Sequence, residues 1–171
     1  YNTLKHEYPL LEGHWQVVHH SEFIRALIAL GELVVDGFVA GGAEGSVPVA
    51  LAAFHEIFYL GRYNGLYDAA RQVLKAVPGL TLAEMVRARE RGFCCGGGGG
   101  GMWMEHEAGQ RVNDLRMQEI LPLGADLAAV ACPFCLVMLD EATGRSADPP
   151  ALKDIAEVVA EAIVGEQDLV K

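Results

Sequence analysis

The residues of this sequence with the clearest capacity for chemistry are four cysteines, arranged as one adjacent pair and one C-x-x-C pair. Cys94 and Cys95 are followed by an unbroken run of six glycines, and Cys132 and Cys135 come later in the chain. Glycine loses more backbone entropy on folding than any other residue, so such a run disfavours helix and strand. It predicts a tight loop that approaches something closely. We therefore expect the four thiols to converge on one site, with an iron–sulfur cluster as the first interpretation.

The charge of this thiol set favours a metal, although the spacing does not decide which one. Four thiolates carry four negative charges, which an iron–sulfur cluster or Zn²⁺ would offset. Zinc sites usually combine two C-x₂₋₄-C pairs, whereas this chain has one such pair and one adjacent pair. Gly96, Gly97 and Gly98 are predicted to belong to the cofactor site, because their backbone N–H groups can bond to cluster sulfur. Structural disulfides rank low, since a chain so well supplied with core residues does not need them.

Bulk composition narrows the class of protein. The chain has 171 residues, about half of them hydrophobic, and a net charge of −10. This predicts one folded domain and argues against binding to nucleic acid or, by charge alone, to an anionic membrane surface. No stretch reaches the roughly 18 apolar residues of a membrane span, and no secretory signal is visible. We expect a cytoplasmic chain that is a piece of a longer protein.

Apolar runs of strand length alternate with helical patterns along the chain. Strands are predicted over residues 15–20, 47–54, 80–85 and 127–131. Helices are predicted over residues 1–11, 21–31, 65–77, 103–121, 132–143 and 154–165. This alternation indicates an α/β fold, a parallel-sheet three-layer sandwich of Rossmann-like type.

The predicted sheet explains how distant cysteines meet. In open α/β sheets, ligands bind outside the carboxyl ends of the strands. Residues 55–58 follow one predicted strand, Cys94 and Cys95 follow another, and Cys132 ends a third. Cys135 lies one turn into the next predicted helix, whose free N–H groups and positive dipole end favour a thiolate. The cysteine site is therefore expected at the carboxyl ends of the strands.

At these residues the sequence resembles the cysteine-rich CCG domain found in heterodisulfide reductases and in the iron–sulfur subunits of glycolate oxidase and of lactate utilisation. Those domains carry a single Cys, then Cys-Cys-Gly, then C-x-x-C. Here 35 residues separate Phe58 from Cys94, and 36 separate Cys95 from Cys132. The segment 55–65, HEIFYLGRYNG, looks like the family's His-Asp-Pro-Cys-Tyr-Leu-Gly-Arg segment. The resemblance spans nearly the whole chain, so residues 1–171 are identified as a single CCG-type domain, the C-terminal fragment of a longer iron–sulfur protein.

The resemblance implies an electron-transfer domain of a heterodisulfide reductase-like iron–sulfur oxidoreductase. It implies a [4Fe-4S] cluster, cubane or non-cubane, held by Cys94, Cys95, Cys132 and Cys135. Electrons would pass between a flavoprotein partner and a quinone or disulfide acceptor. Further implied partners are a first CCG half and ferredoxin-type cluster domains, in an assembly associated with the inner face of the membrane. No acid–base pair or nucleophilic triad is apparent, so no catalytic residue is assigned.

The loop around the family's first cysteine departs from the family pattern. Phe58 takes the place of that cysteine, and Glu56 and Ile57 replace an Asp-Pro. This departure supports an alternative, a structural or interaction domain whose four cysteines hold zinc or nothing. His55 is assigned to the cofactor site, where it could replace the lost thiolate, because imidazole does so in some clusters. We favour the other interpretation of His55, a loop histidine hydrogen-bonded to the backbone.

Other residues receive weaker interpretations. His19 and His20 are adjacent at a predicted strand end, so they are expected to point to opposite faces and not to share a metal. Trp103 is predicted to be a packing anchor. The segment 62–64 is predicted either to line the site or to be a solvated loop. Nucleotide binding is the weakest alternative, because the glycine run lacks the G-x-x-x-x-G-K-[ST] pattern.

Overall fold

The computed structural model describes residues 1–37, 50–104 and 111–163, and within them it shows one parallel sheet. The strand order is β2-β1-β3-β4. The strands are β1 (Ala50–Phe54), β2 (Leu80–Ala83), β3 (Leu127–Val130) and β4 (Ala151–Asp154). Each neighbouring pair is parallel, which confirms the predicted fold class. The carboxyl ends of all four strands therefore lie along one edge of the sheet.

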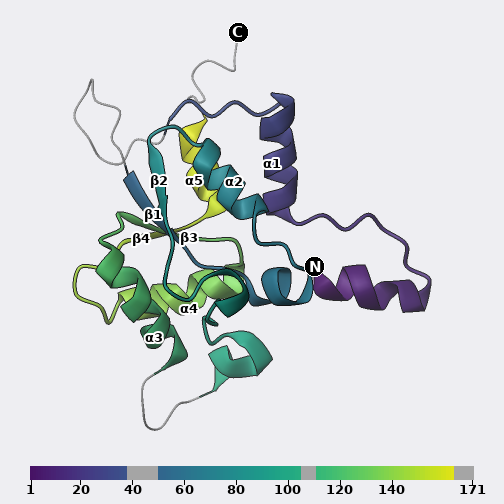
Figure 1. Ribbon diagram of the computed structural model, residues 1–171. Helices are drawn as coiled ribbons and strands as arrows, with labels where there is room; N and C mark the ends of the chain where they lie inside the picture. The colour runs from purple at the N-terminus through teal and green to yellow at the C-terminus, as the bar shows by residue number, and fades with distance from the viewer. Residues whose placement is uncertain (38–49, 105–110, 164–171) are drawn as a thin grey trace.

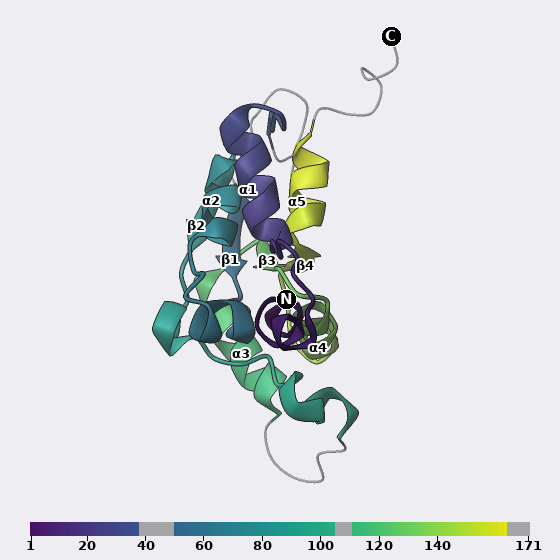
Figure 2. The ribbon, with the colours of Figure 1, turned by 90° about the vertical axis from the view of Figure 1, so that its right-hand side faces the viewer.

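Helices cover both faces of the sheet, giving three layers (Figures 1 and 2). One face carries α1 (His20–Leu30), α2 (Ala69–Ala76) and α5 (Ile155–Ala162). The other carries α3 (Val112–Ile120) and α4 (Pro133–Thr143). Alternate residues of β3 belong to opposite layers: Leu127 and Ala129 to the first core, Ala128 and Val130 to the second. This is why the run reads as continuously apolar: both faces of a central parallel strand are buried.

Helix caps fix the ends of two helices that the sequence predicts. Asp154 and Glu157 form a capping box at the start of α5, and the helix ends at Ala162, short of the predicted residue 165, which lies outside the described residues. In α1 the cap is His19 rather than Ser21: its Nδ1 accepts a hydrogen bond from the Ser21 backbone N–H at 3.2 Å. The Glu22 carboxylate accepts one from the His19 backbone N–H at 3.2 Å, which completes a capping box.

The cap residue His19 also makes the free energy of unfolding depend on pH. Burial, and then the neighbouring His20, lower the pKa of His19 from 6.5 to about 4. The unfolded chain therefore binds a proton at a higher pH than the folded chain does. Hence the stability that the neutral His19 cap contributes is fully present above about pH 6.5 and is lost as the pH falls toward about 4. His19→Asn keeps a capping oxygen but has no group that titrates in this range. We therefore expect this variant to lose less stability than the wild type between neutral pH and pH about 4.5, as measured by urea unfolding. His14→Asn, at an exposed histidine, is the control, and an unchanged pH slope in His19→Asn would contradict the assignment.

Three sequence predictions need correction. The predicted strand over 15–20 is wrong: residues 14–19 form no strand, and His19 begins the cap of α1 instead. Strand β4 was not predicted, because its four residues Ala-Leu-Lys-Asp are only partly buried at the edge of the sheet. The helix predicted over 103–121 begins at Val112, since the chain is extended at Met104. The intervening residues 105–110 lie outside the described part of the chain. Residues 38–49 do so as well, and they include the first three residues of the strand predicted over 47–54.

Smaller differences affect the loops. The helix predicted over 65–77 begins later, at Ala69. The segment predicted as a loop after β1 contains a helical turn, Tyr59–Tyr63. The glycine run is folded into short 3₁₀ turns over Gly98–Trp103, within which Gly99 and Gly100 have positive φ. In the described residues no helix is long and apolar enough to cross a bilayer.

Candidate metal centre

A cavity of about 770 Å³ opens at the carboxyl edge of the sheet, and all four cysteines line it. The loops after β1, β2 and β3 supply most of its wall, as the parallel topology requires. Its rim carries large exposed aromatic side chains, namely Phe58, Tyr59, Trp103 and Phe134. The structure therefore brings the predicted cysteines to one place, and that place is the predicted edge of the sheet.

The four sulfurs form a connected set. Cys95, which is buried, accepts hydrogen bonds from Cys135 and Cys94. These bonds hold the pKa of Cys95 far below its usual value, while the bond to Cys95 raises the pKa of Cys94. Cys135 is hydrogen-bonded to both Cys132 and Cys95, and these bonds raise its pKa. Cys95 is thus favoured as a thiolate even before a metal offsets the charge, and the thiolate is the state that metal ligation needs.

The start of α4 holds the C-x-x-C pair. Cys132 is the N-cap residue and Pro133 occupies the first helical turn, where its missing N–H costs nothing. The pKa of Cys132 is lowered to about 6, chiefly by the hydrogen bond from Cys135 and further by the backbone N–H groups of Cys135 and Phe134. The backbone N–H groups at the helix start therefore add to the stabilisation of a thiolate at Cys132, whereas the pKa of Cys135, where the sequence placed this effect, is raised.

The glycine loop turns its backbone donors toward the other two sulfurs. The Gly96 N–H donates to Cys94 Sγ at 3.2 Å, and Gly98 and Gly97 add backbone hydrogen bonds to Cys94 and Cys95 respectively. Gly96 has φ +89°, and a Cβ added there would meet Val112 Cβ at 3.0 Å. A Cβ at Gly97 would lie 3.7 Å from Cys95 Sγ. Side chains are absent here because the loop packs closely on both the sulfurs and the second core.

Gly101 is far less replaceable than Gly98. A Cβ at Gly101 would collide with the Gly96 carbonyl oxygen, whereas a Cβ at Gly98 meets no atom within 4 Å. We expect Gly101→Ala to displace the loop and lower the free energy of unfolding by about 1–3 kcal/mol. Gly98→Ala is the matched control and should change it by less than about 0.5 kcal/mol. Equal effects of the two substitutions in chemical denaturation would show that the close approach at Gly101 does not matter.

His55 lies beneath the sulfurs and is 1% exposed. One ring nitrogen is within 4.8 Å of the Cys95 and Cys135 sulfurs. The favoured sequence interpretation, a side chain bonded to the backbone, is wrong: Nδ1 accepts a hydrogen bond from Arg116 Nε at 2.9 Å. Nε2 is buried and has no hydrogen-bond partner of nitrogen or oxygen among the described residues. Burial is the main cause that lowers the pKa of His55, so the imidazole is neutral.

These features fit a thiolate-bound metal group. Four sulfurs face one cavity, backbone N–H groups point at them, and a buried imidazole nitrogen beside them lacks a nitrogen or oxygen partner among the described residues. Phe58 contributes no ligand atom: its ring lines the cavity, with the Arg62 guanidinium 5.1 Å from its centroid. The geometry therefore offers four sulfur ligands.

Other sequence-predicted residues lie elsewhere or behave differently. Trp103 is 80% exposed, so it is not a packing anchor. Arg62 and Asn64 do not line the cavity, because they bond to the Gly92 carbonyl and to the Tyr59 carbonyl. The rings of His19 and His20 lie against each other in a tilted arrangement with centroids 4.3 Å apart, contrary to the prediction of opposite faces, since no strand forms there.

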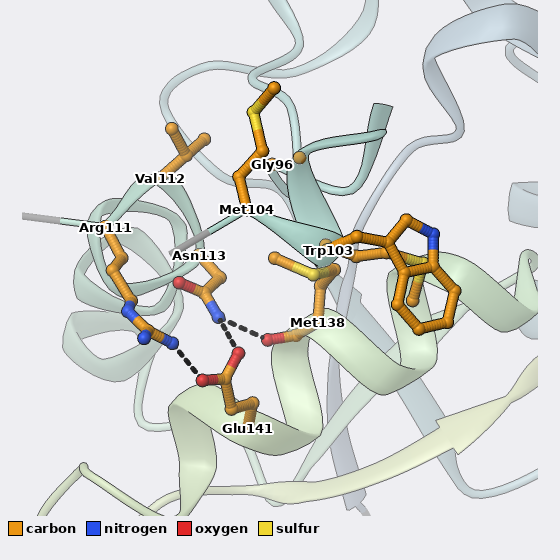
Figure 3. Close-up of a pocket in the computed structure, with 10 residues that line it drawn as sticks. Gly96, Trp103, Met104, Arg111, Val112, Asn113, Met138 and Glu141 are labelled. Carbon is orange, nitrogen blue, oxygen red and sulfur yellow. Dashed lines mark hydrogen bonds and ion pairs between the residues drawn. The ribbon is translucent and has the colours of Figure 1, made fainter. Parts of the chain in front are cut away.

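A second cavity of about 300 Å³ (Figure 3) adjoins the first and shares Gly96, Met102, Trp103 and Val112 with it. Its polar wall joins α3 to α4. The fully buried Asn113 donates from Nδ2 to the Met138 carbonyl at 2.8 Å and to Glu141 at 3.2 Å. Arg111 pairs with the same Glu141 carboxylate. Each of these polar groups is already bonded, so the wall serves to hold the two helices together.

Sequence reasoning missed Arg116 and Asn113, which are both fully buried. In the helix predicted over 103–121, the apolar residues at helical spacing are Met104, Ala108, Val112 and Leu115, of which Ala108 lies outside the described residues. The buried face is instead Asn113, Arg116, Met117 and Ile120. That face has the i, i+3, i+4, i+7 spacing of a core-facing helix, but two of its four members are polar. The spacing was the available signal, and the polar residue types concealed it.

Comparison with known proteins adds a family match. The model of a family described as "CCG: Cysteine-rich domain" matches residues 52–140. The chain is 39% identical over 168 residues to the "Probable iron-sulfur-binding oxidoreductase FadF" of Bacillus subtilis, covering 96% of this chain and 22% of that protein. It is 36% identical to the "EtfAB:quinone oxidoreductase" of Syntrophomonas wolfei, covering 95% and 23%.

A third relative comes from Methanosarcina barkeri. The chain is 29% identical to one subunit of its "Dihydromethanophenazine:CoB--CoM heterodisulfide reductase", covering 95% of this chain and 38% of that subunit. The chain thus spans between 22% and 38% of the length of these three relatives. No solved structure matches the chain.

Proposed function

Because the chain belongs to the CCG cysteine-rich domain family, we propose that it is an electron-transfer domain of an iron–sulfur oxidoreductase. Cys94, Cys95, Cys132 and Cys135 hold a [4Fe-4S] cluster in this proposal. The observation that carries it is the convergence of four sulfurs on one cavity, with backbone N–H groups of the glycine loop directed at them. The matched relatives, named as iron–sulfur and quinone or heterodisulfide oxidoreductases, support it.

A cluster bound here would supply one-electron redox chemistry, and the protein would supply ligands, donors and shielding. Cys95 and Cys135 are buried while Cys94 and Cys132 are partly exposed, so the site has a dry side and an open side. The N–H groups of Gly96 and Gly97 offset thiolate charge, which favours the reduced state. No acid–base group of the described residues is given a catalytic role.

The proposed partners come from the family resemblance, and the small share of its relatives that the chain covers, 22–38%, agrees with them. Residues 1–171 are one CCG-type domain of a longer protein that also contains a first CCG half and ferredoxin-type cluster domains. Electrons pass between a flavoprotein and a quinone or disulfide acceptor, in a cytoplasmic assembly on the inner face of the membrane. One relative is named a "Probable membrane-anchored ferredoxin", which supports the last point. The exposed Tyr59, Trp103 and Phe134 around the cavity suit a surface that another domain covers.

A structural domain with zinc in the four-cysteine site is the second candidate. The observation that favours it is Phe58, which removes one thiolate and places an aromatic ring in the wall of the cavity. A tetrahedral set of four thiolates is sufficient for structural zinc. In that case the cysteines stabilise the fold and transfer no electrons.

Metal analysis separates the two candidates. The chain is purified without oxygen, and its iron, zinc and acid-labile sulfide are measured, with electron paramagnetic resonance on the same sample. Iron and sulfide near four of each per chain, with absorbance near roughly 400 nm, are expected for the cluster. Stoichiometric zinc in a colourless protein, or free thiols without metal, would overturn the electron-transfer assignment.

A further inference from the structure

Arg116 is a buried cation whose partners define its orientation. Its side chain is 0% exposed, and it enters the second core from α3. Nη1 donates to the Glu119 carboxylate at 2.6 Å and to the Arg87 carbonyl at 2.9 Å. Nε donates to His55 Nδ1 at 2.9 Å. Nη1 and Nε of the guanidinium are therefore committed, Nε to the imidazole, while Nη2 is buried without a hydrogen-bond partner among the described residues.

This contact determines which ring nitrogen of His55 carries hydrogen. Guanidinium has donors only and no acceptor, so Nδ1 must supply the lone pair. A neutral imidazole has one N–H and one lone pair, which places the hydrogen on Nε2. Nε2 is the buried atom without a nitrogen or oxygen partner among the described residues, and a ring nitrogen lies within 4.8 Å of two sulfurs. Of these two sulfurs, Cys95 is the one whose pKa His55 helps to lower, which marks it as the acceptor for the Nε2–H.

We propose that His55 is a positioning residue that donates its Nε2–H to the Cys95 sulfur, in the tautomer that Arg116 imposes. The inference rests on the proposed function only in taking Cys95 as a metal ligand. An Nε2 that carries hydrogen has no lone pair for a metal. His55 consequently does not replace the thiolate missing at Phe58, and the site keeps four protein ligands. Arg116 acts through His55, as an outer partner that orients a ligand contact.

The direction of the effect on a bound cluster follows from charge. Hydrogen bonds to ligand sulfurs withdraw electron density and favour the reduced state, so they raise the reduction potential. His55 adds such a bond to Cys95 on the dry side of the site, where the Gly97 N–H already donates. Removal of the His55 donor is therefore expected to shift the potential to more negative values without changing the number of ligands.

The first test measures the tautomer directly and needs no iron. Long-range ¹H–¹⁵N correlation spectra of the zinc-loaded or metal-free chain distinguish a protonated Nε2 from an unprotonated or metal-bound one. We expect His55 as the Nε2–H tautomer in the wild type and in Arg116→Gln, whose amide can still donate to Nδ1. Arg116→Met removes the donor and should release the tautomer. An Nδ1–H tautomer in the wild type, or a metal-bound His55 nitrogen, would overturn the inference.

The second test measures the potential of the cluster-loaded chain. His55→Gln can donate to sulfur and accept from Arg116, so it should keep a potential near that of the wild type. His55→Leu can do neither and should have a clearly more negative potential, while exposed His14→Gln is the control. Equal potentials in the Gln and Leu variants, or a strongly coupled histidine nitrogen in pulsed electron paramagnetic resonance, would refute the proposed donor role. Failure to bind iron would refute the proposed function alone, because the tautomer would still be decided by the first test.

Discussion

Replacement of Cys95 by serine is expected to abolish cluster binding almost completely. Cys95 is the central sulfur of the set. It is hydrogen-bonded to Cys94, Cys135 and His55 and is buried from solvent. A serine hydroxyl is a poor ligand for iron and does not ionise at neutral pH. Loss of outer partners alone costs about 10–100-fold in metal affinity, so loss of a ligand should leave less than about a tenth of the iron and sulfide.

The control for this variant replaces another sulfur-containing side chain, outside the cysteine cavity, by serine. Met104 is 62% exposed and lines only the adjoining cavity. Met104→Ser should retain wild-type iron and sulfide content after identical anaerobic reconstitution. Substantial iron in Cys95→Ser, together with an unchanged electron paramagnetic resonance signal, would exclude Cys95 as a ligand. Circular dichroism on both variants establishes that the fold is intact.

Arg71→Met is expected to cause the largest loss of stability, about 3–5 kcal/mol in the free energy of unfolding, because it leaves a buried carboxylate unpaired. Arg71 is 2% exposed, and its Nη1 lies 2.7 Å from Glu56 Oε1. It also donates from Nε and Nη2 to Glu84, at 2.5 and 2.9 Å, and from Nη1 to the Tyr67 carbonyl at 2.6 Å. Burial would lower the pKa of Arg71, but its contacts with Glu84 and Glu56 outweigh this and raise it. Methionine fills similar volume and removes every one of these contacts.

An exposed arginine whose backbone N–H bonds to the same Glu56 carboxylate provides the control. Arg89 is 43% exposed and pairs with Asp68, which is 62% exposed. Surface ion pairs contribute about 0–1 kcal/mol, so Arg89→Met should lie in that range by urea unfolding. The Arg89 backbone N–H, which bonds to Glu56, stays in place. If both variants lowered the free energy of unfolding by the same amount, the buried pair of Arg71 and Glu56 would not stabilise the fold more than a surface pair does.

The central sheet and the cysteine edge could be predicted from the sequence for local reasons. Strands β1 and β3 are buried on both faces, so their continuous apolar runs are visible without knowledge of the neighbours. The C-x-x-C pair follows one such run, and Pro133 after Cys132 marks the start of the next helix. Parallel order then placed the strand ends together, because right-handed crossover connections leave few alternatives.

Other elements depend on contacts that no local pattern records. Strand β4 is a strand because β3 pairs with it, not because Ala-Leu-Lys-Asp prefers extended structure. The segment before α1 has strand-like residues but no partner strand in the described part of the chain, so its final histidine becomes a cap. The buried face of α3 is partly polar, because Asn113 bonds to the carbonyl of Met138 and Arg116 bonds to His55.

By itself, then, the sequence determined the parallel α/β architecture, the four thiols and the edge at which they gather, because burial periodicity and cysteine spacing are written in local order. Only the tertiary structure decided the chemical state of the groups around them. Cys95 is hydrogen-bonded to Cys94 and to Cys135 of the other pair. Arg116, which is 61 residues away from His55 in the chain, determines which nitrogen of the His55 ring carries hydrogen. A proton position depends on which donor faces which lone pair, and that geometry exists only once the layers have packed.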